Sequence, residues 1–152
     1  MSAILDMPLE KFQAYFIESV PQYRALKLRA IERASGYLCY DMPYSESLIG
    51  DPATGEIHEF AITTLIDAVC ATAIQTRLDK FHRTATLDLR VDFMRKGRAG
   101  RVVRCEAECL RLDTNTATVR AVAHEGDKSD PLAISTGSFA IIPVRRAAKA
   151  TS

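Results

Sequence analysis

Residues 50–78 read GDPATGEIHEFAITTLIDAVCATAIQTRL, a turn-rich segment that leads into a long apolar stretch. From Glu59 to about Leu78, apolar side chains fall on nearly every side of a helix, which predicts a helix wrapped by other structure. Between Phe60 and Thr76 the one charged residue is Asp67. This run barely reaches the length of a membrane span, and its Thr and Gln residues favour a buried core helix, so we expect no membrane insertion.

Around this helix the chain alternates between apolar and polar residues, as strands do. An amphipathic helix is predicted over residues 8–19, with Pro8 at its start. Strands are predicted over residues 23–33, where the alternation is imperfect, and over 37–42, 84–94, 101–112, 116–123 and 132–143; residues 43–56 are predicted as a loop. The last four strands would form a meander, which gives an α+β fold with helices on one face of an antiparallel sheet. Because open sheet edges favour pairing, we expect a homodimer or larger assembly that joins sheet edges.

The alternation also assigns faces within the strands. Leu87, Leu89, Val91 and Phe93 share one face of their strand, and Val103, Cys105, Ala107 and Cys109 share one face of the next. Arg104, Glu106 and Glu108 lie on the opposite face, available for cross-strand pairs with Arg90 and Asp92. Cys105 and Cys109 would lie about 13 Å apart along a strand, too far for a disulfide. No cysteine spacing fits zinc, so we expect no metal site and free thiols in a reducing cytosol.

Composition limits the classes of function. The chain has 152 residues, which suggests one domain, and its 20 Lys and Arg against 19 Asp and Glu give a net charge of +1. This balance, with no Trp, gives no electrostatic or stacking basis for binding nucleic acid. The N-terminus lacks the features of a signal peptide, so a cytoplasmic protein is expected. Residues 145–152 form a basic tail, expected to be a solvated end.

Asp67 is the first candidate for chemistry. An isolated carboxylate in an apolar helix costs several kcal/mol if it is dry and unpaired, so it must face a cleft, a subunit interface or water. A solvated helix edge, or a structural pair with Thr63, would also explain it. His58 stands at the start of the helix, where free backbone N–H groups can bind a carbonyl oxygen and stabilise an anion. Alternatively, His58 and Glu59 are a helix cap and a first-turn acid.

Other common catalytic patterns are missing from the sequence. There is no Gly-x-Ser-x-Gly nucleophile motif and no phosphate-binding Gly-x-x-x-x-Gly-Lys. His82 and His124 stand beside predicted turns and are expected on the surface. The helix and the loop before it therefore hold the candidate site.

Three fragments, in order and at matching spacing, carry a resemblance to a known family. Residues 51–58 read DPATGEIH and resemble a loop of the form Asn-Pro-x-Thr-Gly-x-x-His-Gly-Gly, with an acidic residue nine positions after the His, which is Asp67 here. Residues 86–95, TLDLRVDFMR, and 135–139, STGSF, resemble two strands of the same family. Over roughly residues 35–142 the chain resembles the hotdog-fold acyl-CoA thioesterases, in particular the phenylacetate-degradation (PaaI-like) branch.

The resemblance implies a site at a dimer interface of a homodimer or homotetramer, with acyl-CoA as substrate and no cofactor beyond the coenzyme A of that substrate. Asp67 would be the general base that activates water, or the nucleophile that forms a mixed anhydride. Backbone N–H groups near Glu59 and Phe60 would form the oxyanion hole, shaped by His58. Thr86 of the facing subunit would help to place the water. Arg95, Lys96 and Arg98 would meet the phosphates of coenzyme A; otherwise they are a solvated basic turn.

Two departures from the family pattern keep other functions open. The Gly-Gly after the His is Glu59-Phe60 here, which should crowd the thioester and oppose an oxyanion. The loop Asn is Asp51, an acceptor in place of an amide donor. Asp51, Glu59 and Asp67 could then place three carboxylates near one site and raise one another's pKa. A hotdog protein that binds acyl-CoA without hydrolysing it, or a hydratase or dehydratase on the same fold, are the alternatives.

Overall fold

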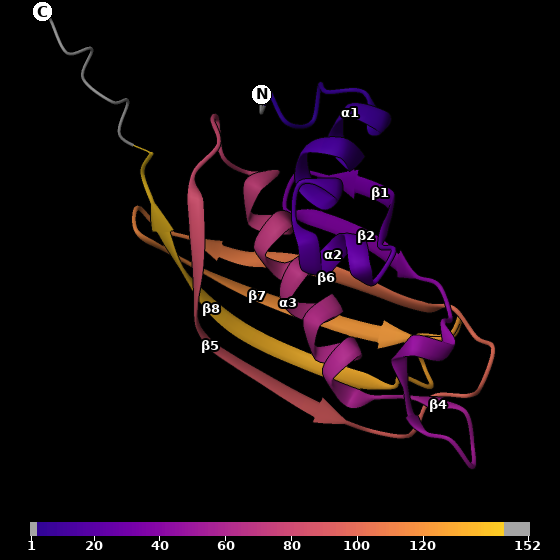
Figure 1. Cartoon of the computed structure of the whole chain (residues 1–152). Coiled ribbons are helices and arrows are strands. Elements are labelled where there is room, and N and C mark those ends of the chain that lie inside the picture. The colour runs from indigo at the N-terminus through magenta and orange to yellow at the C-terminus, as the bar shows by residue number, and fades with distance from the viewer. Residues whose placement is uncertain (1–2, 145–152) are drawn as a thin grey trace, which may run out of the picture.

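A computed structural model of the chain describes residues 3–144, in which one antiparallel sheet curves around a long helix, α3 (Figure 1). The predicted tail at residues 145–152 lies outside the described residues. Helix α3 spans Glu59–Gln75, three residues shorter than predicted. It ends there because the Thr76 hydroxyl donates to the Ala73 carbonyl at 2.7 Å and also accepts the N–H of Gly36 at 2.8 Å.

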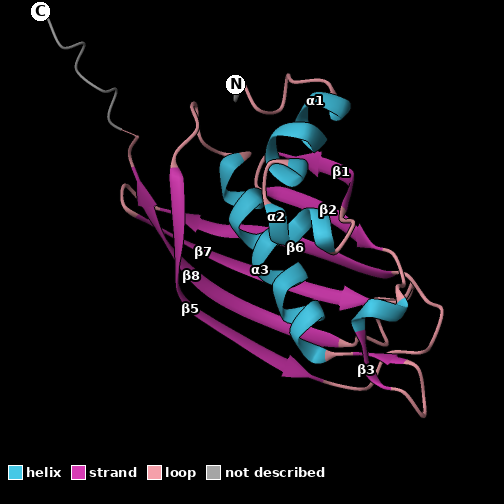
Figure 2. Cartoon of the chain, in the orientation of Figure 1, coloured by secondary structure: helices cyan, strands magenta, loops and turns pink. Residues whose placement is uncertain are grey.

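The six-stranded sheet has the order β1-β2-β6-β7-β8-β5, and every neighbouring pair is antiparallel (Figure 2). The bounds are β1 Arg29–Ala34, β2 Tyr37–Met42, β5 Arg83–Phe93, β6 Val103–Leu112, β7 Thr116–His124 and β8 Ala133–Ile142. The predicted α+β class is confirmed, and so is the meander for β6, β7 and β8. It is wrong for β5, which pairs with β8 at the far edge. Alternation along a strand identifies its buried face but does not identify its neighbour.

The N-terminal segment differs most from prediction. Helix α1, Leu9–Gln13, continues into a π-helical turn, η1, Ala14–Glu18, and is followed by α2, Pro21–Ala25. Residues 23–25, predicted as the start of a strand, are therefore helical, and Pro21 stands at the start of α2, where a helix tolerates proline best. Gln13 holds this segment to the sheet, because its side-chain amide donates to the Leu28 carbonyl and accepts the N–H of Ala30, both at 2.9 Å.

The predicted loop over 43–56 contains three short elements. A 3-10 turn, η2 (Glu46–Leu48), leads into a hairpin of β3 (Ile49–Asp51) and β4 (Glu56–Ile57). The chain passes His58 so closely that a Cβ on Gly50 would lie 2.9 Å from the His58 Cα. This hairpin delivers the chain to the first residue of α3.

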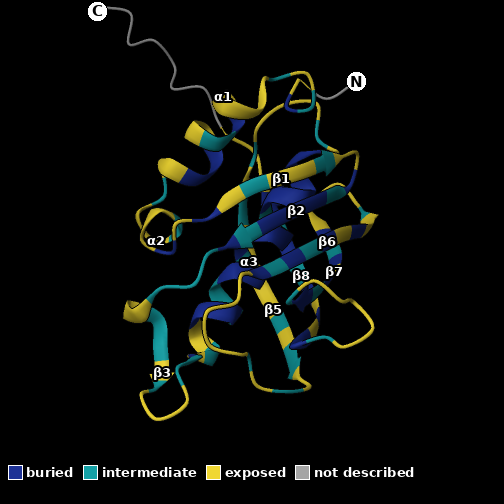
Figure 3. Ribbon diagram, turned by 90° about the vertical axis from the view of Figure 1, so that its right-hand side faces the viewer, coloured by how far each residue is buried: buried dark blue, intermediate teal, exposed yellow. Residues whose placement is uncertain are grey.

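The core lies between α3 and the inner face of the sheet, and Figure 3 shows most of α3 as buried. Helix α3 packs across β2, β6 and β7. The inner row Val103, Cys105, Ala107 and Cys109 of β6 is buried as predicted, and all four cysteines of the chain are buried and free. On β5, Leu89 and Val91 pack against the core, but Leu87 is 61% exposed because the pairing of β5 with β8 is irregular between Thr86 and Asp88. The prediction that Leu87 shares a buried face with them is wrong.

The outer face of the sheet carries ion pairs that differ from the predicted ones. Arg104 pairs with Asp41 at 2.7 Å, and Glu108 pairs with Arg120 at 2.8 Å, because β2 and β7 flank β6. Arg90 and Asp92 pair with each other on β5. Within residues 3–144, no helix is both long enough and apolar enough to cross a bilayer.

Candidate functional site

The carboxylate of Asp67 faces β5, where the hydroxyl of Thr86 donates a 2.7 Å hydrogen bond to its Oδ1. Both side chains belong to the same chain, whereas the resemblance implied a Thr86 from the facing subunit; β5 runs beside α3, so a second copy is not needed for this contact. Asp67 is partly exposed, and its partner is Thr86 rather than Thr63. One oxygen of a carboxylate is thus held by a hydroxyl, while the other is left for a further partner.

The N-terminus of α3 is built by His58, Glu59 and Phe60. The Nδ1 atom of His58 accepts the N–H of Phe60 at 3.1 Å, and the His58 ring lies 4.8 Å from the Phe60 ring. The Phe60 side chain is 76% exposed. His58 is therefore the helix cap, and its bond occupies one of the two N–H groups predicted for an oxyanion hole. The N–H of Glu59, at the first position of the helix, has no acceptor within the helix.

The Glu59 side chain is held by Lys96. Lys96 Nζ lies 3.1 Å from Glu59 Oε1 and 3.4 Å from Glu56 Oε1. Hydrogen bonds to Glu59 and Glu56 raise the pKa of Lys96, which stays charged beside them. A cation from the β5–β6 connection therefore partly offsets the negative charge predicted to oppose an oxyanion, since Lys96 brings one positive charge to two carboxylates.

Two further basic residues of that connection, Arg95 and Arg98, are also paired. Arg95 contacts Glu125 and Asp130, each at 3.0 Å, and Arg98 lies 3.8 Å from Asp130. A phosphate of coenzyme A would have to replace one of these carboxylates. The structure brings Arg95, Lys96 and Arg98 together as ion pairs, and their contact with coenzyme A stays a prediction.

Asp51 is a turn residue in the structure. Its Oδ1 accepts the N–H of Ala53 at 2.9 Å, and its carbonyl accepts the N–H of Gly55 at 2.8 Å. Eight helical residues separate Glu59 from Asp67, which is about 12 Å along the axis. Within one chain Glu59 and Asp67 therefore lie more than two helical turns apart, and a cluster that joins Asp51, Glu59 and Asp67 across a subunit interface stays a prediction.

Sequence reasoning missed Tyr23. Burial and the negative charge of Asp67 raise the pKa of Tyr23 to about 12, so its phenol is protonated at neutral pH. Tyr23 lies in α2, 44 positions before Asp67 in the chain, and was predicted to be in a strand. No local pattern signals a contact of this separation. His124, predicted on the surface, is buried at the end of β7, where β6 and the following turn cover it.

Comparisons with known proteins show the family and the fold of the chain. The sequence profile of the Thioesterase superfamily matches residues 55–131, which include His58, Asp67 and Thr86. A medium/long-chain acyl-CoA thioesterase, YigI of Salmonella typhimurium, is 28% identical over 145 residues, 84% of this chain and 92% of that protein. A solved structure from Pseudomonas aeruginosa is 32% identical with a TM-score of 0.78, covering 88% of this chain and 98% of that one.

The PaaI protein of the Escherichia coli phenylacetic acid degradation operon has the same fold at 16% identity, with a TM-score of 0.76 over 88% of this chain and 93% of that one. The antiparallel sheet around α3, the His58 cap and the Asp67–Thr86 pair thus occur in a chain whose sequence and fold match one family. The chain belongs to the Thioesterase superfamily and has the hotdog fold.

Proposed function

We propose that this protein hydrolyses acyl-CoA thioesters and that Asp67 activates the attacking water. The observation that carries the proposal is the 2.7 Å hydrogen bond from Thr86 to Asp67, which fixes one oxygen of a carboxylate on an otherwise apolar helix. A carboxylate oriented in this way can take a proton from a water bound at its other oxygen. The name of the Salmonella relative supports medium or long acyl groups as substrates.

In the proposed reaction, water gives a proton to Asp67 as its oxygen forms a bond to the thioester carbon. The carbonyl oxygen becomes an oxyanion, which a backbone N–H at a helix N-terminus stabilises. The C–S bond then breaks, coenzyme A leaves as a thiolate that takes up a proton, and the carboxylic acid remains. If Asp67 instead attacked the carbon itself, a mixed anhydride between the acyl group and Asp67 would form and water would then hydrolyse it.

The oxyanion donor in this proposal is Glu59 N–H of a second copy. Within one chain, about 12 Å of helix separates Glu59 from Asp67. A reacting thioester needs its carbon and its oxygen each about 3 Å from these two groups, so one chain cannot supply both. Two copies side by side can supply both groups, because the N-terminus of α3 in each copy can then lie beside Asp67 of the other.

The test is thiol release from short, medium, long and aromatic acyl-CoAs. We expect Asp67→Asn to lower kcat by about 10²- to 10⁴-fold, the usual contribution of a general base. Asp113→Asn, in the turn between β6 and β7, is the matched control and keeps wild-type activity. Hydrolysis by Asp67→Asn at the wild-type rate would overturn the assigned role.

A second candidate, acyl-CoA binding without turnover, is favoured by the side chains of Glu59 and the exposed Phe60 at the helix N-terminus. A pure binding protein would be stabilised against heat by acyl-CoAs and release no thiol. Measuring both signals on one preparation separates the two functions.

A further inference from the structure

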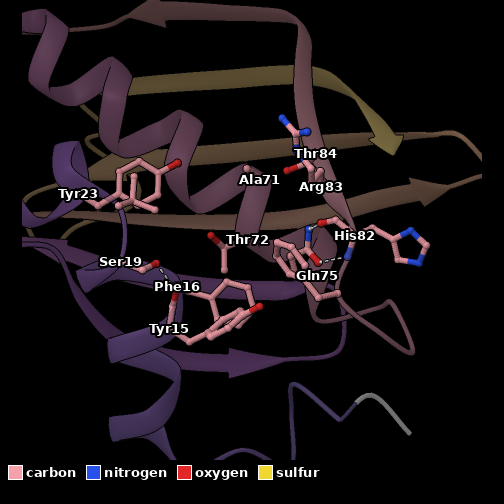
Figure 4. Close-up of a pocket in the computed structure, with 12 residues that line it drawn as sticks. Tyr15, Phe16, Ser19, Tyr23, Ala71, Thr72, Gln75, His82, Arg83 and Thr84 are labelled. Carbon is pink, nitrogen blue, oxygen red and sulfur yellow. Dashed lines mark hydrogen bonds between the residues drawn. The ribbon is translucent and has the colours of Figure 1, made fainter. Parts of the chain in front are cut away.

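A hollow of about 410 Å³ lies between the N-terminal helices and the second half of α3. Its walls include Tyr15 and Phe16 of η1, Tyr23 of α2, Ala71 of α3, Phe81 and Thr84. Figure 4 shows Tyr23 on one side of this hollow, and Gln75 and His82 on the other. We call it the aromatic hollow, because four of these six residues carry aromatic rings.

One side of the aromatic hollow adjoins Asp67. Ala71 follows Asp67 by one helical turn and lies on the same face of α3. Thr84 precedes Thr86 by two residues on β5, so both side chains leave the strand on the same side. Tyr23 is close enough to Asp67 for the carboxylate charge to raise its pKa. Three elements thus connect the hollow to the proposed reaction centre.

The other side is closed by the connection between α3 and β5. The side-chain amide of Gln75 donates to the His82 carbonyl at 2.7 Å and accepts the His82 N–H at 3.3 Å, which holds this connection against the helix. Phe81, beside His82, packs edge-on against Tyr15 with ring centroids 5.7 Å apart. Phe81 and Tyr15 thereby form a hydrophobic end wall.

The distance between the Asp67 side of the hollow and its Gln75 side determines how long an acyl chain the hollow can hold. Asp67 and Gln75 are eight residues apart on α3, about 12 Å. An extended alkyl chain advances about 1.3 Å per carbon, since its 1.5 Å bonds zigzag. Along α3 the hollow therefore has room for about nine carbons between Asp67 and Gln75, and Gln75 holds His82, the neighbour of Phe81 in the end wall.

We propose that the aromatic hollow receives the acyl chain of the substrate and that Phe81 and Tyr15 limit its length to about ten carbons, counting the carbonyl. This inference rests on the proposed function, because it takes Asp67 as the reaction centre. The hollow is also lined by polar residues, among them Ser19, Thr72 and Arg83, but its aromatic rings and Ala71 offer apolar surface to a saturated chain. Such a chain gains affinity by about fourfold for each methylene that leaves water. Tyr15 and Phe81 determine specificity and take no part in the chemistry.

The experiment measures binding with S-alkyl-CoA thioethers, which cannot be hydrolysed. Dissociation constants for S-butyl-, S-hexyl-, S-octyl-, S-decyl- and S-dodecyl-CoA are determined by calorimetry on the full-length protein. In the wild type, affinity should rise with each pair of carbons and stop rising beyond S-decyl-CoA. The same preparations are then assayed for hydrolysis of acyl-CoAs of matching lengths.

Two variants change the hollow in opposite directions. Ala71→Leu fills the hollow about 6 Å from Asp67. This variant should raise the dissociation constant of S-decyl-CoA at least tenfold and leave that of S-butyl-CoA within about twofold of the wild-type value. Phe81→Ala removes the end wall and should lower the dissociation constant of S-dodecyl-CoA at least fivefold. Leu110→Ala, an exposed apolar residue on β6, is the matched control and should leave the whole profile unchanged. Unchanged binding of S-butyl-CoA shows that each variant is folded.

The outcomes separate this inference from the proposed function. If the thioethers bind with the expected profile and the variants shift it, the assignment of the hollow holds even if no acyl-CoA is hydrolysed, and the proposed function is wrong. If acyl-CoAs are hydrolysed but Ala71→Leu and Phe81→Ala show the same chain-length profile as the wild type, the assignment of the hollow is overturned. The proposed function then stands.

Discussion

At the N-terminus of α3, Glu59 and Lys96 form an ion pair. The negative charge of Glu59 would destabilise an oxyanion bound there, and the positive charge of Lys96 would stabilise it. We expect Lys96→Met to expose the Glu59 charge and lower kcat by about two- to fivefold, the usual effect of one charge near a helix N-terminus. Adding Glu59→Gln should restore the rate. Both side chains are about half exposed or more, so the effect should shrink in high salt.

The same variants test whether Lys96 contacts coenzyme A. If Lys96 binds a phosphate of coenzyme A, its loss in Lys96→Met should raise KM and leave kcat unchanged. Adding Glu59→Gln would then not restore KM. Steady-state kinetics of the single and double variants therefore separate the two roles. An unchanged kcat and KM in all three variants would contradict both.

Residues adjacent in sequence were easier to predict than residues adjacent in space. Asp67 was found because a lone carboxylate in an apolar helix is costly, and His58 because it precedes that helix; the structure confirms His58 as the cap. Thr86 was named from the resemblance, but its contact within the same chain was not predicted. Tyr23 was missed, because a contact across 44 residues leaves no periodic signal.

Among the elements, prediction succeeded where burial imposes a period. Strands β6, β7 and β8 begin and end within three residues of their predicted bounds, because one face of each is buried. Helix α3 does so as well, because its continuous apolar run is wrapped by the sheet on most sides. Two features were wrong. The neighbour of β5 depends on long-range pairing, and the weakly patterned residues 23–25, predicted as strand, are helical. The helix predicted over residues 8–19 is present as α1 and η1.

His124, buried where β7 ends beside β6, should make the free energy of unfolding depend on pH. Its Nδ1 accepts the Gly126 N–H at 3.1 Å, so Nε2 carries the proton and donates to Glu106 at 3.2 Å. Lys128 also contacts Glu106, and Asp41 and Asp127 are the nearby acids. Burial, followed by the positive charge of Arg104, lowers the pKa of His124 below 6.5.

Between that lowered pKa and 6.5 the unfolded chain binds more protons, so the free energy of unfolding falls as the pH falls through this window. The slope contributed by one group is at most about 1.4 kcal/mol per pH unit. Urea unfolding of wild type and His124→Gln at pH 7.5 and 5.5 checks this. We expect a smaller loss on acidification in the variant; equal losses would show that His124 is not responsible.

For the whole molecule, the central question is how many copies make one site. The sheet has two edge strands, β1 and β5, and β5 carries both Thr86 and the exposed Leu87. An edge of this kind favours pairing with a second copy. In the proposed two-fold dimer, two equivalent sites would each combine Asp67 of one copy with the α3 N-terminus of the other.

Two different inactive variants can then restore each other. Glu59→Pro removes the free N–H at the first helical position, where proline is well tolerated, and His58 already has the extended ψ of 137° that a residue before proline needs. Glu59→Ala, which keeps the N–H, is the matched control and should remain active. Co-expressed with two different affinity tags, Glu59→Pro and Asp67→Asn chains should form doubly tagged dimers.

In such a dimer, one site combines both defects, and the other combines an intact Asp67 with an intact helix N-terminus. We expect about half of the wild-type activity per dimer, although each variant alone is inactive. If each chain held a complete site, both chains of the dimer would be defective and no activity would return. Thiol release from the doubly tagged preparation therefore decides between a shared site and two separate ones, and restored activity would require the oxyanion donor to come from the opposite copy.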